Sequence, residues 1–323
     1  MTNWIEDCLQ ALPRKRVAVI GDFFLDRYLM IDSSRDEPSL ETGLTAYQVV
    51  GQRLYPGAAG NVAKNLAALG VGHVVCFGII GRDGEGYALT NALSEWGVET
   101  DALIPHSSRV TPSYNKPIRD GREANRLDIK NFTQTPPHME QELLEEIFAE
   151  WNELDAIVIG DQVAEDDCGT ITHRVREALC ERARSSNLPI YTDSRAHIMQ
   201  YAHVMTKCND REAVQAFPDM PDIPSRALEW SRRTGRPAFI TCGEQGQYVA
   251  ADGECVLVPA RKVEGPVDIC GAGDACAAGT VAALCCGRSP VEAAQLGNLV
   301  ASITIGKLGV TGEASPGEVR ALL

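Results

Sequence analysis

The residues with the clearest chemistry lie at positions 267–279, where two glycines flank Ala272 just before an alanine-rich apolar run. We predict a strand end, a tight turn through Gly271 and Gly273, and then the start of a helix. Backbone N–H groups in a first helical turn lack partners and lie at the positive end of the helix dipole, so this turn can hold an anion. Asp274 would then be either an ordinary helix N-cap or a general base beside a transferring phosphoryl group.

Two other glycine motifs do not fit this segment. The dinucleotide-binding pattern G-x-G-x-x-G would need a glycine at position 276, where the chain has Cys276. The phosphate-binding string G-x-x-x-x-G-K-[ST] does not occur anywhere in the sequence. The sequence therefore argues against a dinucleotide oxidoreductase and against a P-loop nucleoside triphosphatase.

Two segments far from residues 267–279 in the sequence carry further candidate binding residues. Asp22 and Asp26 follow the first apolar strand, and Gly57 and Asn61 lie at the start of a predicted helix. With the D-x-x-G-A-G-D run at 268–274, their order and spacing resemble PfkB-type (ribokinase-like) carbohydrate kinases over residues 16–310. Within that family the chain is most similar to the kinase domain that phosphorylates heptose 7-phosphate, through the segments 25–28, 34–35, 126–128 and 306–309.

The resemblance implies transfer of the ATP γ-phosphate to a sugar hydroxyl. Asp274 would be the general base, and the turn before it would stabilise charge on the moving phosphoryl group. The implied catalytic and anion-hole residues are Asp274, Gly271, Ala272 and Gly273, and the implied sugar contacts are Asp26, Gly57, Asn61 and Asp22. Ala58 stands where the family has a second glycine, which places an extra methyl group near the sugar.

The same resemblance implies a nucleotide and magnesium site. Its residues would be Thr241, Gly243, Gly246 and Asn298 for the nucleotide and Asn209 and Glu212 for Mg²⁺. Asn209 and Glu212 have capping-box spacing as well, so a helix start explains them equally. Cys270 replaces the threonine common in the family, which argues against a monovalent cation. A phosphorylated sugar would also need cations, for which the candidates are Arg119, Arg126, Lys64 and Arg35.

Alternating strands and helices predict the scaffold for these residues. Apolar strands are expected at 17–20, 74–80, 156–159, 189–192, 203–205 and 238–242, and helices at 61–69, 86–96, 168–184, 273–286 and 291–306. This order indicates an α/β, ribokinase-like fold whose mostly parallel sheet has helices on both faces. We predict one domain over 1–323. Segments 28–55 and 111–130, the latter with an Asp120-Gly121 hairpin turn, would form a small β-sheet lid.

Composition narrows the partners. The 323 residues carry a net charge of −14 without a basic block, which argues against nucleic acid, and they contain no long apolar run that would predict a membrane span. The N-terminus shows no signal-peptide pattern, and the eleven cysteines fit buried free thiols in a reducing cytoplasm. A lid face could pair with a second copy. The remaining alternatives are a kinase of fructose, ribose or a nucleoside, and a non-catalytic sugar- or nucleotide-binding relative.

Overall fold

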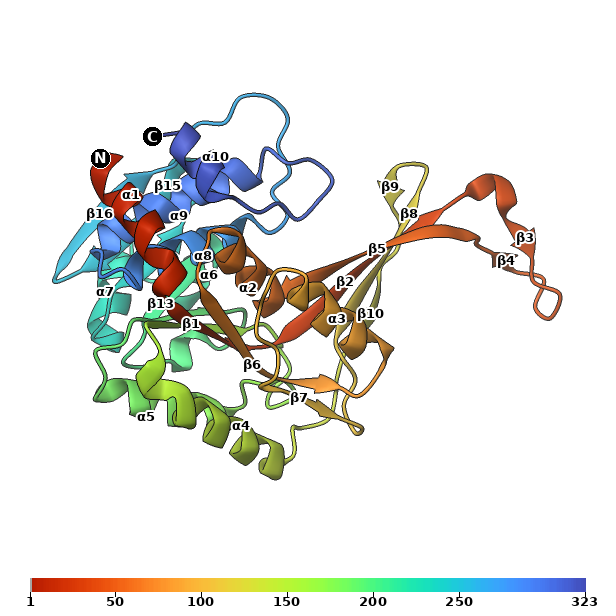
Figure 1. Cartoon of the computed structure of the whole chain (residues 1–323), viewed down its shortest axis with the longest axis horizontal. Helices are drawn as coiled ribbons and strands as arrows, with labels where there is room; N and C mark the ends of the chain where they lie inside the picture. Colours follow the sequence, from red (N-terminus) through yellow and green to blue (C-terminus); the bar gives the residue numbers. More distant parts are fainter. Residues whose placement is uncertain (1) are drawn as a thin grey trace.

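The computed structural model describes residues 2–323, and its main element is a nine-stranded sheet (Figure 1). The strand order is β16-β15-β14-β13-β12-β11-β1-β6-β7, and all neighbours are parallel except at one edge, where β15 is antiparallel to both β14 and β16. The strands are β1 (Arg16–Gly21), β6 (His73–Gly81), β7 (Leu103–His106), β11 (Ala156–Asp161), β12 (Ile190–Ser194), β13 (Met205–Asn209), β14 (Ala238–Thr241), β15 (Gly246–Ala251) and β16 (Glu254–Pro259). The expected mostly parallel sheet is confirmed.

Helices cover both faces of this sheet. The α-helices are α1 (Thr2–Ala11), α2 (Ala59–Ala68), α3 (Gly84–Ser94), α4 (Pro137–Glu150), α5 (His173–Arg184), α6 (Asp210–Ala216), α7 (Ile223–Thr234), α8 (Ala272–Leu284), α9 (Pro290–Thr304) and α10 (Pro316–Ala321). Alternate side chains of β1 enter two separate cores: Val17 and Val19 pack with α2, α8 and α9, whereas Ala18 and Ile20 pack with α4, α5 and α7. Two buried faces explain why this strand reads as a continuous apolar run.

A second sheet extends from the body as a long arm (Figure 1). Its strands are β2 (Phe23–Ile31), β5 (Val49–Ala58), β8 (Ser113–Arg119), β9 (Arg122–Glu123) and β10 (Leu127–Ile129), in the order β10-β8-β2-β5, with β9 paired to β8. The short strands β3 (Glu37–Pro38) and β4 (Thr45–Ala46) lie at the far end of the arm. The predicted lid sheet is present.

The lid is longer than its predicted limits of 28–55 at the first segment. The strand β2 begins at Phe23, with only Asp22 between it and the end of β1, and β5 continues to Ala58. The chain changes sheets at Gly21, which has a φ of 155° and where a methyl group would lie 2.2 Å from the Gly160 carbonyl oxygen. Only glycine allows this close approach. Because the chain passes from one sheet to the other at this glycine and without a loop, the sequence shows no turn residues at the boundary between the main sheet and the lid.

Three other predicted elements are placed differently. The helix expected at 168–184 begins at His173, because Thr172 caps it by accepting from the Val175 N–H at 3.2 Å. The strand expected at 203–205 lies at Met205–Asn209. The segment before Gly271 contains no strand, and Asp268 instead donates its N–H to the Ile305 carbonyl. Within residues 2–323, no helix combines the length and the apolar character needed to cross a membrane.

Candidate active site

Asp274 lies where α2 and α8 meet. It is the third residue of α8, whose N-cap is Gly271, so Asp274 is not the N-cap that the sequence allowed as one interpretation. Its carboxylate accepts a hydrogen bond from Asn61 Nδ2 at 2.8 Å, across 213 residues of sequence. The surrounding protein removes water from this carboxylate and raises its pKa to about 6, although the Asn61 bond acts in the opposite direction. A carboxylate with this pKa is ionised but still basic near neutral pH.

The glycine turn beside Asp274 exposes three N–H groups. Gly271 has a φ of 76°, and a methyl group there would lie 2.7 Å from Asn61 Nδ2, so glycine brings the turn against Asn61. The Ala272 N–H donates to the Ile269 carbonyl at 3.1 Å, which removes it from the predicted anion hole. Among the described residues, none accepts a hydrogen bond from the N–H of Gly271, Gly273 or Asp274. These three groups can face an anion.

Asp26 faces the same site from the lid. Its Oδ2 lies 3.0 Å from Lys116 Nζ on the neighbouring strand β8, and that ammonium also donates to the Tyr28 hydroxyl at 3.2 Å. Asp26 Oδ1 is buried and has no hydrogen-bond partner among residues 2–323. A buried unpaired carboxylate oxygen costs free energy unless a ligand donates to it, which is what a sugar hydroxyl can do.

Gly57 lies directly against this carboxylate. A methyl group on Gly57 would lie 3.2 Å from both Cγ and Oδ1 of Asp26. We expect Gly57→Ala to crowd the free oxygen and to raise the KM for the acceptor sugar by roughly 10-fold, the effect of about 1.4 kcal/mol. The matched control is Gly51→Ala on the same strand, where the nearest atom would be Met30 Cγ at 3.9 Å. Equal KM values for the two variants in steady-state kinetics would contradict the placement.

Asp22 has a structural position. Its carboxylate accepts N–H groups from Gln162, Val163 and Thr170 at 2.7–3.0 Å, while its own carbonyl accepts from the Ala59 N–H at 3.1 Å. Asp22 thus ties the β1–β2 junction to the start of α2 and to the loop after β11. Its oxygens are occupied by the protein, so the geometry does not support the expected sugar contact.

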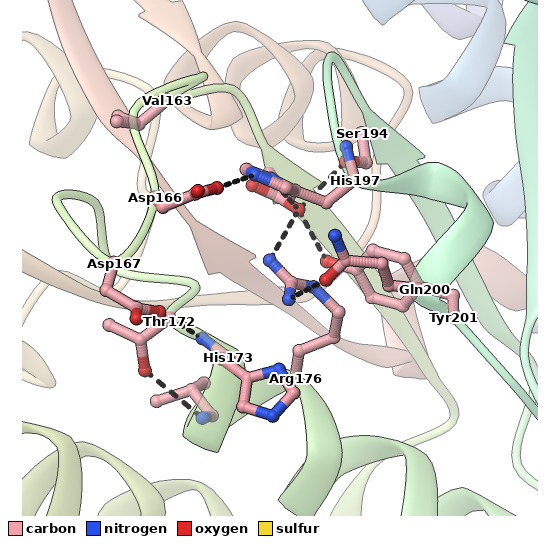
Figure 2. Close-up of polar contacts among 12 residues, drawn as sticks. Val163, Asp166, Asp167, Thr172, His173, Arg176, Ser194, His197, Gln200 and Tyr201 are labelled. Carbon is pink, nitrogen blue, oxygen red and sulfur yellow. Dashed lines mark hydrogen bonds and ion pairs between the residues drawn. The ribbon is translucent and has the colours of Figure 1, made fainter.

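A cluster of polar side chains contacts the loop after β11, which also binds Asp22 (Figure 2). The buried Asp161 carboxylate accepts from Ser194 Oγ at 2.8 Å and from the Tyr201 hydroxyl at 3.0 Å. His197 lies between Asp161 and Asp166, with Nε2 3.0 Å from Asp166 Oδ1, and the Asp161 carboxylate, 3.5 Å from Nδ1, raises the pKa of His197. The cluster fixes the 162–172 segment that grips Asp22. Sequence reasoning did not find it, because its members come from two separate segments, 161–166 and 194–201.

Arg119 lies away from the site. It donates to Ser33 Oγ and to Asp36 Oδ2 at 2.9 and 3.0 Å near the outer part of the lid. Tyr114 pairs in register with Asp26, and Arg119 is five residues further along β8, or about 16 Å. The cations near Asp26 are instead Lys116 and Arg126, whose guanidinium stacks on Tyr114 at 4.1 Å.

The other two candidate cations serve neighbouring segments. Lys64 is bound to the Thr311 carbonyl and to Glu313, and Arg35 pairs with Asp32 on the lid.

The predicted nucleotide residues lie at the antiparallel edge of the sheet. Thr241 ends β14, and a 3₁₀ turn at Gly243–Gln245 leads to Gly246, which has a φ of 103°. The Asn298 side chain accepts from Gln247 Nε2 and donates to the carbonyls at 258 and 259, so it joins α9 to β15 and β16. Its polar atoms are engaged within the protein, and a nucleotide contact through this amide would require their rearrangement.

Asn209 and Glu212 form the capping box that was the alternative interpretation. The Asn209 Oδ1 accepts from the Glu212 N–H at 2.9 Å, and Glu212 Oε2 accepts from the Asn209 N–H at 2.8 Å. Over residues 2–323, no group of three or more histidine, cysteine, aspartate or glutamate side chains is arranged to hold a metal. Glu212 Oε1 receives no hydrogen bond from the described residues, which leaves one carboxylate oxygen available to a hydrated cation.

Asp268 closes the start of the glycine turn. Its two oxygens accept the N–H groups of Cys270 and Gly309 at 3.0 and 3.1 Å. Cys270 is exposed, unlike the buried thiols expected for all the cysteines.

Two buried lysines at the site were missed by sequence reasoning. Lys116 faces Asp26, and Lys207 lies in the middle of β13 with its Nζ 2.6 Å from Asp193 Oδ2. A single lysine within a short strand gives no periodic signal. Lys207 could have been noticed because it lies two residues before Asn209, at the end of a predicted parallel strand where ligands bind.

Comparisons with known proteins show the family of this chain. A family model described as pfkB family carbohydrate kinase matches residues 14–316. The chain belongs to this family. As a pfkB family carbohydrate kinase it is a phosphotransferase enzyme, and its fold is ribokinase-like.

Two curated relatives of this pfkB family member are named bifunctional protein HldE. The one from Geotalea uraniireducens (strain Rf4) is 30% identical over 98% of the chain, and the one from Caulobacter sp. (strain K31) is 32% identical over 94% of it. The chain spans only 64% and 63% of their lengths. Arabidopsis thaliana ribokinase, solved with ribose and ATP, superposes with a TM-score of 0.71 at 15% identity, covering 95% of this chain and 98% of that one.

Proposed function

We propose that this carbohydrate kinase transfers the γ-phosphate of ATP to a hydroxyl of a sugar or sugar phosphate, with Asp274 as the general base. The observation that carries the proposal is the Asp274 carboxylate, held by Asn61 next to the free N–H groups of Gly271 and Gly273. A base and an anion site within one helical turn can serve a hydroxyl and the phosphoryl group that it attacks.

In the proposed reaction, Asp26 and Asn61 orient the sugar from the lid and from α2. The acceptor hydroxyl gives its proton to Asp274 as its oxygen forms a bond to the γ-phosphorus, and the bond from phosphorus to the leaving ADP oxygen breaks. The N–H groups of Gly271 and Gly273 stabilise the negative charge on the moving phosphoryl oxygens. Asp274 keeps the proton until it is released to solvent.

We place the nucleotide along the Thr241–Gly246 turn and Asn298. Mg²⁺, when bound with the nucleotide, would neutralise phosphate charge. Asn209 and Glu212 would hold the waters of that ion, since Mg²⁺ takes one or two carboxylates and keeps several waters. The free Glu212 Oε1 fits such a limited role.

A heptose 7-phosphate-like acceptor is favoured. The HldE relatives and the segments 25–28 and 126–128 support it, and Lys116 and Arg126 provide cations on the lid for an anionic sugar. Fructose, ribose or a nucleoside are the alternatives. A screen of sugars and sugar phosphates for sugar-dependent ADP formation tests the proposal. We expect turnover to be highest with a heptose 7-phosphate. Binding of sugar and nucleotide without product after long incubation would indicate a non-catalytic relative.

We further propose one domain over 1–323, a cytoplasmic location and a homodimer formed through the lid. The eleven free thiols suit a reducing compartment. The lid exposes the apolar side chains Leu40, Leu44, Tyr47 and Val50, which a second copy could cover. Light scattering that shows a monomer at working concentration would contradict the dimer.

The pH dependence follows from the base. Because the pKa of Asp274 is raised to about 6, we expect kcat/KM for the sugar to fall as the pH drops through about 6, one proton being involved. Burial also raises the pKa of Asp22 to about 6, so unfolding must be followed at each pH. Loss of activity while the protein stays folded points to Asp274. A profile that is flat to about pH 5 would contradict its role as base.

A further inference from the structure

A buried lysine approaches the glycine turn from the sheet. Lys207 is the third residue of β13, two residues before the strand ends at Asn209, and it pairs in register with Asp193 of β12. The two side chains are only 10% and 18% exposed, and Nζ lies 2.6 Å from Asp193 Oδ2. Because β12 and β13 are parallel, their carboxyl ends lie at the same end of the sheet, and this end faces Gly273 at the start of α8. Nothing assigned to the site so far uses this charge.

The ammonium group points toward Gly273. A methyl group built on Gly273 would lie 3.4 Å from Lys207 Nζ, an ordinary contact distance. Burial works against the charge of Lys207, but Asp193 and Asp274 outweigh it and raise the pKa of the lysine. The ammonium therefore stays protonated throughout the physiological range.

Only one of the three ammonium donors is used. Within the described part of the chain, Asp193 is the sole hydrogen-bond acceptor for Nζ. Removing an ammonium from water is unfavourable, and one carboxylate contact does not satisfy its other donors. The Lys15–Asp155 pair has the same composition and a 2.8 Å contact, but its side chains are 26% and 31% exposed, so water can serve the remaining donors of Lys15.

We propose that Lys207 is a further catalytic residue, which contacts the γ-phosphoryl group of the nucleotide through the two donors that Asp193 leaves free. This rests on the proposed function. The N–H groups of the glycine turn supply partial charges, whereas Lys207 would supply a full positive charge to the same phosphoryl group. No proton leaves Lys207 during the reaction. Asp193 is a positioning residue that holds the ammonium in place.

A cation that contacts the γ-phosphoryl group should favour the binding of ATP over that of ADP, which lacks this group. By calorimetry, we expect Lys207→Met to weaken binding of a non-hydrolysable ATP analogue by roughly 10- to 100-fold and to leave ADP binding within about 2-fold. The same variant should lower kcat by about 10²-fold or more, with little change in the KM for the sugar. Lys207→Arg, which keeps the charge, should recover much of the analogue affinity. In Lys207→Met, the buried Asp193 loses its counter-ion and could prevent folding. The double variant Lys207→Met/Asp193→Asn removes both charges, so the same binding test can be made on it.

The matched control is Lys15→Met, whose lysine precedes β1 and pairs with Asp155, the residue before β11, at the opposite end of these parallel strands. It should change neither nucleotide affinity. Equal loss of ADP and analogue binding in Lys207→Met, or no loss of either, would overturn the proposal. If wild type phosphorylates no sugar but the analogue-to-ADP contrast holds, the proposed function fails and the phosphoryl contact of Lys207 stands. If wild type binds neither nucleotide, both fail.

Discussion

Replacing Asp274 by asparagine is expected to lower kcat by about 10²- to 10⁴-fold, the usual contribution of a general base. Asparagine keeps the shape of the side chain and can still contact Asn61, but it cannot accept the proton of the sugar hydroxyl. The KM values for sugar and ATP should change little, because the anion hole and the lid contacts are intact. A coupled assay of ADP formation measures the loss, and wild-type turnover in Asp274→Asn would contradict the assignment.

The same variant should be more stable than wild type at neutral pH. A pKa raised from 3.8 to about 6 means that the folded state holds a proton more tightly than the unfolded state, so stability falls as the pH rises through this interval. Asparagine removes this cost, which is up to about 3 kcal/mol above pH 6 and vanishes near pH 4. The free energy of unfolding of wild type and Asp274→Asn, measured with urea near pH 4 and near pH 7, tests whether the variant is the more stable protein at neutral pH.

Glu292 provides a control with the opposite sign. It is also the third residue of its helix, α9, but it closes a capping box with Ser289 and its pKa is lowered by those hydrogen bonds. Glu292→Gln should therefore lose stability at neutral pH and keep its activity. Loss of stability in both variants would show that the environment of Asp274 does not disfavour its charge.

The sequence was sufficient for the parts of the site that local motifs define. The turn at Gly271 and Gly273 and the base at Asp274 lie within one segment, and the family resemblance brought Asn61 to them. The Ala272 N–H was assigned wrongly, because its bond to the Ile269 carbonyl depends on how the chain enters the helix.

The parts that could not be predicted depend on pairing between strands. Lys116 faces Asp26 only because β8 runs parallel to β2 in a particular register, and a shift of one residue would turn it to the other face. Lys207 meets Asp193 for the same reason, in β13 and β12. The limits of the lid were also hidden, because β2 continues from β1 without a loop.

Replacing Asp26 by asparagine is expected to reduce kcat/KM for the sugar by roughly 10²-fold or more and to leave the KM for ATP within about 2-fold. Asp26 Oδ1 is a buried acceptor without a partner, and Oδ2 is bound to Lys116. An amide has only one oxygen. If that oxygen accepts from Lys116, an N–H₂ donor faces the sugar hydroxyl in place of a carboxylate.

Asp36→Asn is the matched control on the same lid. Asp36 also pairs with a cation, Arg119, at 3.0 Å, but it lies near the outer part of the arm and leaves no oxygen toward the site. Asp26→Asn also weakens the counter-ion of Lys116, whose side chain is 9% exposed, so its unfolding must be measured beside its kinetics. If Asp26→Asn and Asp36→Asn reduce sugar turnover equally, the loss comes from a general change in the lid structure and not from a lost contact between Asp26 and the sugar. If only Asp26→Asn reduces it while both remain folded, the free oxygen of Asp26 binds the acceptor.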